Sequence, residues 1–472
     1  MKKRLLALTV AMIMAASTLV ACGGGEAADP AASTDPAATD DTAATDAPAD
    51  SAEPAGDAAA ADGEFVVYGW NDDIKNILDN VYSEYDPDGY ARIRFVNTGG
   101  SDTYQEKIDG LLADATNADY PDLMGLEVDY VQKYVNGPDL LSAADLGITD
   151  EDMANMYNYN KQLGSDADGN VRAFFWQATP GSFQLRADLA EEYLGSTDPQ
   201  VLHDTVFCDV DTIVAKAQEV FEASNGQVAL FAGNEELLRM FQNSRTIGWY
   251  DENDVITIDD QMKTYMETAA EIYPYTFGYG QWATEWTAAM TGDGVESKAA
   301  IAYCGCPWFT YWSLAKTMGE NEDPSQWVGG TILVEGPYQF FWGGTGLAAT
   351  VGCSDTELAA KIIKAFTCDT EFMVKINALN SDFVNNTVAV EQIIANGNDV
   401  CDMMYGDQAF LGFYLPMADS IDASTITAED QSINSAFNQQ VTALFTGEKD
   451  LDTAIADFKS AVATQYTYLT IE

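Results

Sequence analysis

The segment EFVVYGWNDDIKNILDNVYSEY, residues 64–85, joins an apolar strand to an amphipathic helix. Residues 64–70 read as a strand, and Asn71 or Asp72 is placed to cap the helix that follows. The same order recurs downstream. The strands are ARIRFVNTG (91–99) and PDLMGLEV (121–128), and the helices are SDTYQEKIDGLLADA (101–115) and DYVQKYVN (129–136). This alternation predicts an α/β fold whose first lobe holds a parallel sheet with helical crossovers.

Polar residues follow the carboxyl ends of these strands, which is where open α/β sheets bind their ligands. They are Trp70 with Asn71, then Ser101 after two glycines, then Glu127 and Asp129. Glu127 and Asp129 have the same parity on one strand and therefore project to one face. Two interpretations stay open for this pair: hydrogen-bond acceptors for ligand hydroxyls, or a solvated helix start.

The chain begins with MKKRLLALTVAMIMAASTLVAC, which has the pattern of a secretory signal over residues 1–21. Its apolar run is short for a membrane-spanning helix. The ending LVAC resembles the lipobox of bacterial lipoproteins, which implies a lipid anchor on Cys22; an ordinary signal with a chance cysteine is the alternative. Residues 22–63 are rich in Ala, Asp, Thr and Pro and predict a disordered acidic tether.

The composition bounds the partners of the chain. Its 75 acidic residues outnumber its 22 Lys and Arg, which gives a net charge of −53. A field of this sign repels nucleic acid and anionic lipid and favours neutral or cationic ligands. The globular part is longer than one hydrophobic core usually serves, so we expect two lobes.

The sequence shows no pattern of a catalytic or metal site. Its only histidine, His203, lies in a predicted loop, and the DADGN segment at 166–170 lacks the later ligands of a calcium loop and predicts a polar turn. We expect no cofactor, no metal and no catalytic residue. Six cysteines lie beyond residue 22: Cys208, Cys304, Cys306, Cys353, Cys368 and Cys401. Three interpretations are open for them, namely free packed thiols, one or two disulfides, or a metal site.

The order of motifs resembles the extracellular solute-binding proteins of bacterial ABC importers, family 1, the group that binds carbohydrates. The motifs are VVYGWND (66–72), YPDLMGLEVDYVQKYV (120–135), VRAFFWQATPGSFQLRADLAEEYLG (171–195), SKAAIAYCGCPWF (297–309), FFWGGTGLAATVGCSDTELAAKIIKAFTCDTEFM (340–373) and LNSDFVNNTVAV (379–390). The resemblance implies a periplasmic-binding-protein-like fold, with a ligand cleft between two lobes. It also implies three hinge crossings, near Trp176–Gly181, Phe341–Thr345 and Ser381–Val384.

The same resemblance divides the chain into segments. Lobe 1 takes residues 64–178 and a return segment at 342–382, while lobe 2 takes residues 179–341 and a helical part at 383–472.

Four tryptophans fall at strand ends or crossings under this interpretation. Sugars present flat C–H faces and hydroxyl edges, so their sites combine aromatic rings with polar side chains. We expect Trp70, Trp176, Trp308 and Trp342 to stack on the ligand. Asn71, Ser101, Glu127 and Asp129 would hydrogen-bond it, and Gly343 lies at the second crossing. Trp282 and Trp286 are four residues apart, and core and outer subsite both stay open for them.

The resemblance implies a lipid-anchored, monomeric receptor on the extracellular face of a bacterial membrane, of the Gram-positive type. It would capture a neutral di- or oligosaccharide by lobe closure and deliver it to an ABC permease, without enzymatic activity. A receptor for a peptide or a cationic compound is the first alternative, and a surface glycosidase is the second.

Overall fold

The computed structural model describes residues 63–100, 103–292, 297–315, 317 and 330–471. The predicted signal peptide, the anchor residue Cys22, the tether up to residue 62 and the predicted ligand residue Ser101 lie outside these ranges. Within them, no helix has both the length and the apolar character that a membrane crossing requires.

The first sheet has five strands in the order β2-β1-β3-β10-β4. The strands are β1 (Phe65–Gly69), β2 (Ile93–Asn97), β3 (Leu123–Glu127), β4 (Phe174–Phe175) and β10 (Thr345–Ala349). β1 pairs in parallel with β2 and β3, which confirms the predicted parallel sheet at its centre. β10 enters antiparallel between β3 and β4 because the chain comes back from the other lobe at this point. Every residue of β1 is buried, as in strands covered on both faces.

Helices pack around this sheet to form the first hydrophobic core. The predicted helix after β1 is interrupted by a π-helical turn. Its N-cap residue is Asp72, as one of the two predictions has it, but the Asp72 side chain makes no capping hydrogen bond. Asn71 Oδ1 instead accepts the Asp73 backbone N–H at 3.0 Å, in a turn just before the helix. The helices of this part are α1 (Asp73–Ile77), η2 (Leu78–Tyr82), α2 (Ser83–Tyr85), α3 (Pro87–Tyr90), α4 (Tyr104–Leu112), α5 (Val128–Val135), α6 (Asn158–Gly164), α15 (Thr356–Thr367), α16 (Thr370–Asn380), α17 (Thr387–Ala395) and α18 (Leu411–Ala418).

A second, antiparallel sheet carries its own core. β5 (Ser182–Arg186) lies between β8 (Ala302–Gly305) and β9 (Thr331–Val334), and β6 (Val228–Ala229) pairs with β7 (Ala299–Ala300) beside them. The helical segments of this part are α7 (Ala187–Leu189), η3 (Ala190–Leu194), α8 (Pro199–Leu202), η4 (His203–Phe207), α9 (Val210–Ala223), η5 (Asn234–Leu237), α10 (Leu238–Gln242), α11 (Asp260–Ile272), η6 (Tyr273–Tyr275), α19 (Asp430–Phe445) and α20 (Leu451–Gln465). We call the elements around the two cores lobe 1 and lobe 2.

A third, smaller cluster of buried side chains contains four aromatic rings, and four more partly buried rings pack against it. It is built on α12 (Thr284–Thr291), on α13 (Pro307–Phe309) with the π-helical η8 (Thr310–Ala315), and on the crossing at Trp342. We call Trp282, Trp286, Trp308, Phe309 and Trp342 the tryptophan cluster.

Acidic residues at helix starts account for part of the unusual charge. Asp209, Asp355, Asp369 and Asp450 each accept a backbone N–H in the first turn of α9, α15, α16 and α20. A carboxylate at this position satisfies a free donor and interacts well with the helix dipole.

The first predicted crossing is the centre of the connection between the lobes. Residues 176–181 pair on one side with Val384 and on the other with Phe341, through the antiparallel bridges Gln177–Val384 and Pro180–Phe341. Hydrogen bonds from the Ala178 N–H to the Phe383 carbonyl (2.8 Å) and from the Gly181 N–H to the Phe340 carbonyl (2.8 Å) continue this pairing. The three predicted crossings are therefore neighbours in space.

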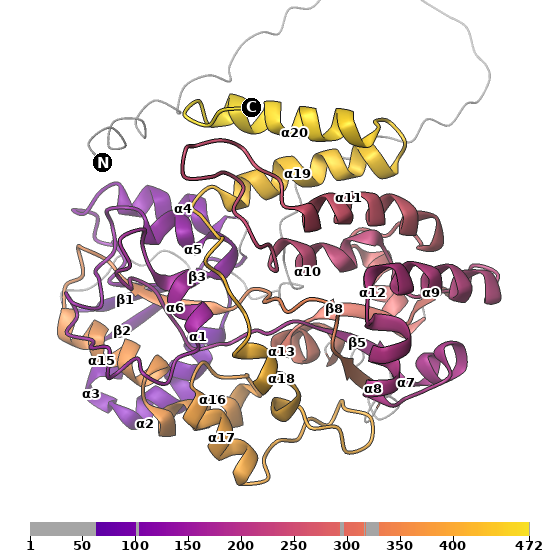
Figure 1. Ribbon diagram of the computed structural model, residues 1–472. Coiled ribbons are helices and arrows are strands. Elements are labelled where there is room, and N and C mark those ends of the chain that lie inside the picture. The colour runs from indigo at the N-terminus through magenta and orange to yellow at the C-terminus, as the bar shows by residue number, and fades with distance from the viewer. Residues whose placement is uncertain (1–62, 101–102, 293–296, 316, 318–329, 472) are drawn as a thin grey trace, which may run out of the picture. The chain divides into compact units, whose positions relative to one another are not determined.

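The structure differs from the prediction in where the third passage between the lobes occurs. The segment at 381–384 lies beside the first crossing, but α17 and α18 after it still pack on the first core through Val390, Ile393 and Tyr414. The chain joins the second core only at Ile433, in α19. Figure 1 shows this long connection running from α18 to α19. The range 383–472, assigned by sequence to lobe 2, is thus divided between the two cores at residues 424–432.

Candidate functional site

The carboxyl ends of β1 and β3 place four of the predicted ligand residues. Trp70 is half-buried, and its ring meets the edges of Tyr104 (5.2 Å between centroids) and Tyr130 (6.3 Å). Asn71 next to it is turned toward the chain, because its Nδ2 donates to Asp73 Oδ2 at 3.0 Å. Asn71 therefore serves as a local turn residue in this structure.

Glu127 and Asp129 play two different roles. Glu127 ends β3, and its Oε2 accepts the Asp129 backbone N–H at 2.7 Å, so it is the N-cap of α5. Asp129 reaches into lobe 2, where its carboxylate lies 2.7 Å from Nη1 of Arg239 on α10. Each of the two carboxylates remains partly exposed. Glu127 thus starts a helix, as the second interpretation has it, while Asp129 lies in α5 rather than on the strand and pairs with Arg239 of the other lobe. A role of either carboxylate as an acceptor for ligand hydroxyls stays a prediction.

The tryptophan cluster brings together Trp308 and Trp342, two of the predicted stacking residues. Their ring centroids are 5.2 Å apart at an interplanar angle of 61°, and Trp308 Nε1 donates to the Trp342 carbonyl at 3.0 Å. Trp342 is almost fully buried, so, contrary to the prediction, it offers no open face to a ligand in this structure, whereas Trp308 is partly exposed. The guanidinium of Arg239 lies 5.7 Å from the Trp342 ring centroid, which is a cation–π distance.

Gly343 marks the point where lobe 1 and the tryptophan cluster meet. Its φ of +62° is left-handed, and a Cβ there would lie 3.0 Å from Glu127 Oε1 and 3.3 Å from Trp308 Nε1. A side chain at this position would therefore be strained and crowded. Because the position is glycine, a carboxylate from β3 and an indole from α13 can approach the same backbone.

Trp176 was expected to stack on a ligand, and the structure corrects this. The side chain is fully buried in the first core, its Nε1 donates to Asp382 Oδ2 at 3.3 Å, and its ring meets Phe366 edge-on. The residue stands at the crossing, but its ring points into the packed side of lobe 1. It offers no face to a ligand in this structure.

Two buried carboxyl groups lie behind these residues. Burial, followed by the nearby charge of Asp382, raises the pKa of Asp73 to about 7. Burial also raises the pKa of Asp382 to about 6, against hydrogen bonds from Gln177 and Trp176 that favour the charged form. Asp73 belongs to α1 and Asp382 to the third predicted crossing, and a charge on one disfavours a charge on the other.

Sequence reasoning missed Arg239 and left Trp282 and Trp286 undecided. Trp286 is buried and donates its Nε1 to the carboxylate of Glu236. Trp282 is partly exposed, and its ring lies 6.5 Å from that of Trp308 at an angle of only 19°. The i, i+4 spacing of the two tryptophans was a usable signal. No signal in the sequence pointed to Arg239, since its short helix lies far in sequence from the strand ends.

In the described part of the chain, no three His, Cys, Asp or Glu side chains gather in a way that could hold a metal ion. His203 starts the π-helical η4, contrary to the loop that was predicted, and its Nδ1 lies 2.9 Å from the Glu335 carbonyl oxygen. The DADGN segment is the expected polar turn, in which Asp166 accepts the Asn170 backbone N–H.

The six cysteines after residue 22 are free thiols. Cys304 and Cys306 are fully buried, and burial raises the pKa of both thiols well above the usual value. Thiols of this kind are poor nucleophiles at neutral pH.

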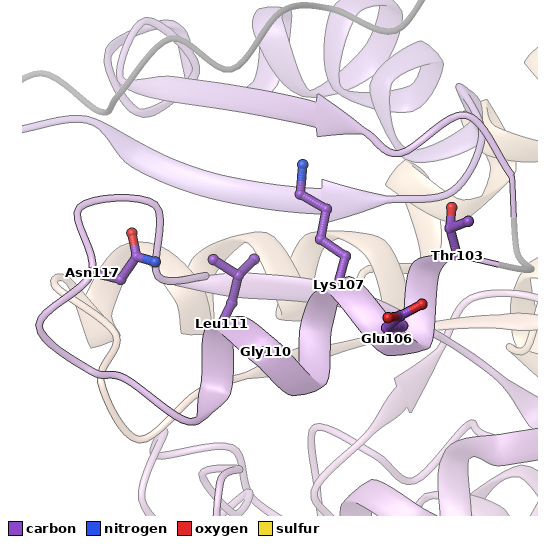
Figure 2. A pocket seen from close by; sticks show the side chains of 6 residues that line it. All are labelled: Thr103, Glu106, Lys107, Gly110, Leu111 and Asn117. Atoms are coloured by element: carbon purple, nitrogen blue, oxygen red, sulfur yellow. The ribbon is translucent and has the colours of Figure 1, made fainter. Parts of the chain in front are cut away.

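An open hollow of about 450 Å³ runs along α4. Figure 2 shows its lining on one face of the helix, from Thr103 and Glu106 to Leu111, with Asn117 at the far end. None of the lining residues is aromatic, so the hollow lacks the flat faces expected of a carbohydrate site.

Comparison with known proteins identifies the fold. No protein-family model matches the chain, and no curated protein matches its sequence. A solved extracellular solute-binding protein of family 1 aligns with a TM-score of 0.71 at 17% identity, over 85% of this chain and 99% of that one.

Two further solved structures are similar. The GacH receptor of Streptomyces glaucescens has a TM-score of 0.64 at 15% identity, over 86% of this chain and 99% of that one. An ABC-transporter-associated binding protein from B. animalis subsp. lactis Bl-04, in complex with β-1,6-galactobiose, gives 0.64 at 15% identity, over 87% and 99%. The chain thus has the two-lobed α/β fold of solute-binding proteins.

Proposed function

We propose that this chain is the solute-binding receptor of an ABC importer and that it captures a neutral di- or oligosaccharide between its lobes. The observation that carries the proposal is the meeting at Gly343. There a lobe 1 carboxylate, Glu127, and an indole of the tryptophan cluster, Trp308, approach the same backbone. Flat rings beside hydrogen-bonding carboxylates suit the faces and the edges of sugars. The solved relatives in complexes with acarbose and with β-1,6-galactobiose support the ligand class.

Ligand binding would be coupled to lobe closure. A ligand that contacts both lobes shifts the population toward the form in which they meet, and a permease can recognise that form. The Asp129–Arg239 pair already joins the lobes beside the tryptophan cluster and would favour the same form. We further propose that Cys22 carries the lipid, that the protein acts as a monomer on the extracellular face of a Gram-positive membrane, and that it has no enzymatic activity.

A screen of ligands by thermal shift tests the proposal directly. The purified protein is heated with mono- and oligosaccharides, amino acids, peptides and polyamines. A ligand at 100 times its Kd stabilises the folded state by about 2.7 kcal/mol, which gives a clear shift. We expect shifts with one family of oligosaccharides. A shift with peptides or polyamines alone would overturn the ligand class, and release of reducing ends from oligosaccharides would indicate a glycosidase.

Trp308→Ala tests the site itself. Loss of the ring should weaken binding of the oligosaccharide found in that screen by about tenfold or more, because stacking and its burial are worth roughly 1.4 kcal/mol or more. Isothermal titration calorimetry measures the change. Trp312→Ala, in the same segment but at an exposed side chain, is the matched control and should leave affinity unchanged. Unchanged affinity in Trp308→Ala would remove this residue from the site.

A further inference from the structure

The turn that leads into α12 has a backbone conformation unusual for its sequence. The Ala283 N–H donates to the Gly280 carbonyl at 3.1 Å, so Gly280, Gln281, Trp282 and Ala283 form a closed turn. Trp282 is its third residue and has a φ of +71°. The third position of a type II turn requires positive φ and normally carries Gly or Asn.

A tryptophan at this position is conformationally strained, so the residues packed around it must hold it there. Bulky residues at positive φ are outliers, and such strain collects at ligand-binding sites. Here the Trp282 ring is held by the rest of the tryptophan cluster, with centroid distances of 5.0 Å to Trp286, 5.9 Å to Trp342 and 6.1 Å to Phe309. It also lies nearly parallel to Trp308, so the conformation aligns two indoles.

Two neighbouring donors on this turn lack acceptors. Among the described residues, neither Trp282 Nε1 nor Gln281 Nε2 has a hydrogen-bond partner, although both atoms are buried. Two other indoles of the tryptophan cluster behave differently, since Trp286 Nε1 donates to Glu236 and Trp308 Nε1 donates to the Trp342 carbonyl. Buried donors are nearly always paired, so an orphaned pair on one turn indicates an acceptor supplied from elsewhere.

The charges around the turn select the kind of acceptor. Glu235 Oε2 accepts the Gln281 backbone N–H at 2.7 Å, and the buried Glu236 carboxylate accepts the Cys304 N–H at 2.9 Å and the Trp286 indole. The Glu235 carboxylate next to the turn disfavours a second anion nearby. A neutral oxygen, such as a hydroxyl or an acetal oxygen, meets no such repulsion.

We infer that the Gly280–Ala283 turn is a specificity-determining element of the ligand site. The Trp282 ring, nearly parallel to that of Trp308, offers the ligand a second aromatic face, and Trp282 Nε1 and Gln281 Nε2 donate to neutral oxygens of the carbohydrate. This inference rests on the proposed function and adds to it the second aromatic face and the two donors. The two side-chain donors of this strained turn have hydrogen-bond acceptors only when such a ligand is bound.

The test compares four variants in the full chain by isothermal titration calorimetry. The probes are acarbose, β-1,6-galactobiose, lacto-N-biose and a disaccharide that contains glucuronic acid. Trp282→Phe keeps a ring but removes the donor, and Gln281→Met removes the neighbouring donor. Trp282→Gly removes the ring yet accepts the positive φ, so it keeps the turn if the other variants disturb it. Trp312→Phe, at a side chain that is 36% exposed, is the control.

We expect the wild-type protein to bind a neutral probe in preference to the acidic disaccharide. Trp282→Phe and Gln281→Met should each weaken binding roughly three- to tenfold, Trp282→Gly should weaken it more, and the control should match the wild type. If the wild type binds a neutral probe and all three turn variants bind it with the same affinity, this inference is overturned and the proposed function is left intact. A wild type that binds none of the neutral sugars overturns both. Equal affinity for the acidic disaccharide overturns the selection for neutral oxygens.

Discussion

At the scale of single residues, the left-handed conformation of Trp282 predicts an inverted order of two substitutions. Trp282→Gly and Trp282→Ala both lose the ring and its packing, but only glycine adopts positive φ without steric cost. We therefore expect the Gly variant to be more stable than the Ala variant by about 1 kcal/mol. Urea unfolding followed by circular dichroism measures the difference.

Trp308 provides the opposite case for comparison, because it lies in the short helix α13. In a helix Gly is less favourable than Ala by about 1 kcal/mol, so Trp308→Gly should be less stable than Trp308→Ala. The same order at both positions would contradict the strained turn.

Some of these residue roles could be predicted and others could not. The spacing of motifs brought Trp308, Trp342, Gly343 and Glu127 to one place, because strand ends and crossings meet in a two-lobed fold. The same logic failed for Trp176, since a position at a crossing does not tell which way a side chain points. The backbone angle at Trp282 also leaves no trace in the sequence.

At the scale of elements, the third predicted crossing depends on one asparagine. Asn385 is fully buried; its Oδ1 accepts the Tyr157 N–H at 2.9 Å and its Nδ2 donates to the Phe175 carbonyl at 2.9 Å. Asn385→Ala leaves two buried backbone groups without partners, so the free energy of unfolding should fall by about 2–4 kcal/mol. Chemical denaturation measures the loss.

The adjacent Asn386 is the matched comparison for this change. Its Oδ1 caps α17 by accepting the Ala389 N–H, so Asn386→Ala should cost only about 1 kcal/mol. Equal costs for the two variants would contradict the bridging role of Asn385.

The elements themselves were largely predictable where periodicity is strong. β1, β2 and β3 and the helices after them follow the apolar pattern of the first lobe. The antiparallel direction of β10 could not be predicted, because it depends on where the chain returns from the other lobe. The late passage to lobe 2 after α18 could not be predicted either, because it depends on which core the apolar helices α17 and α18 join. Apolar side chains on α17 and α18 fit either core equally well by pattern alone.

At the scale of the whole molecule, some of the many acidic residues cap helices and others are buried. Helix caps use several of the aspartates, while Asp73, Asp382 and Glu236 are buried, and their pKa values are raised chiefly by burial, that of Glu236 to about 8. A raised folded-state pKa means that the folded protein binds more protons than the unfolded chain above about pH 4. The stability of the protein should therefore depend on pH in a direction fixed by these groups.

We expect the free energy of unfolding to decrease as the pH rises from about 5 to 8. Each of these carboxyls ionises there at a cost in the folded state, with a slope of at most about 1.4 kcal/mol per pH unit per group. Asp73→Asn removes one such group and its repulsion with Asp382, and an amide oxygen can still accept from Asn71. This variant should therefore melt higher at pH 8 and show a flatter profile. Asp114→Asn is the comparison, because hydrogen bonds from Thr116 lower the pKa of Asp114 and confine its effect to below about pH 4. A stability that instead rises between pH 5 and 8, or a profile unchanged in Asp73→Asn, would mean that Asp73 is not held in a buried, charge-disfavouring site.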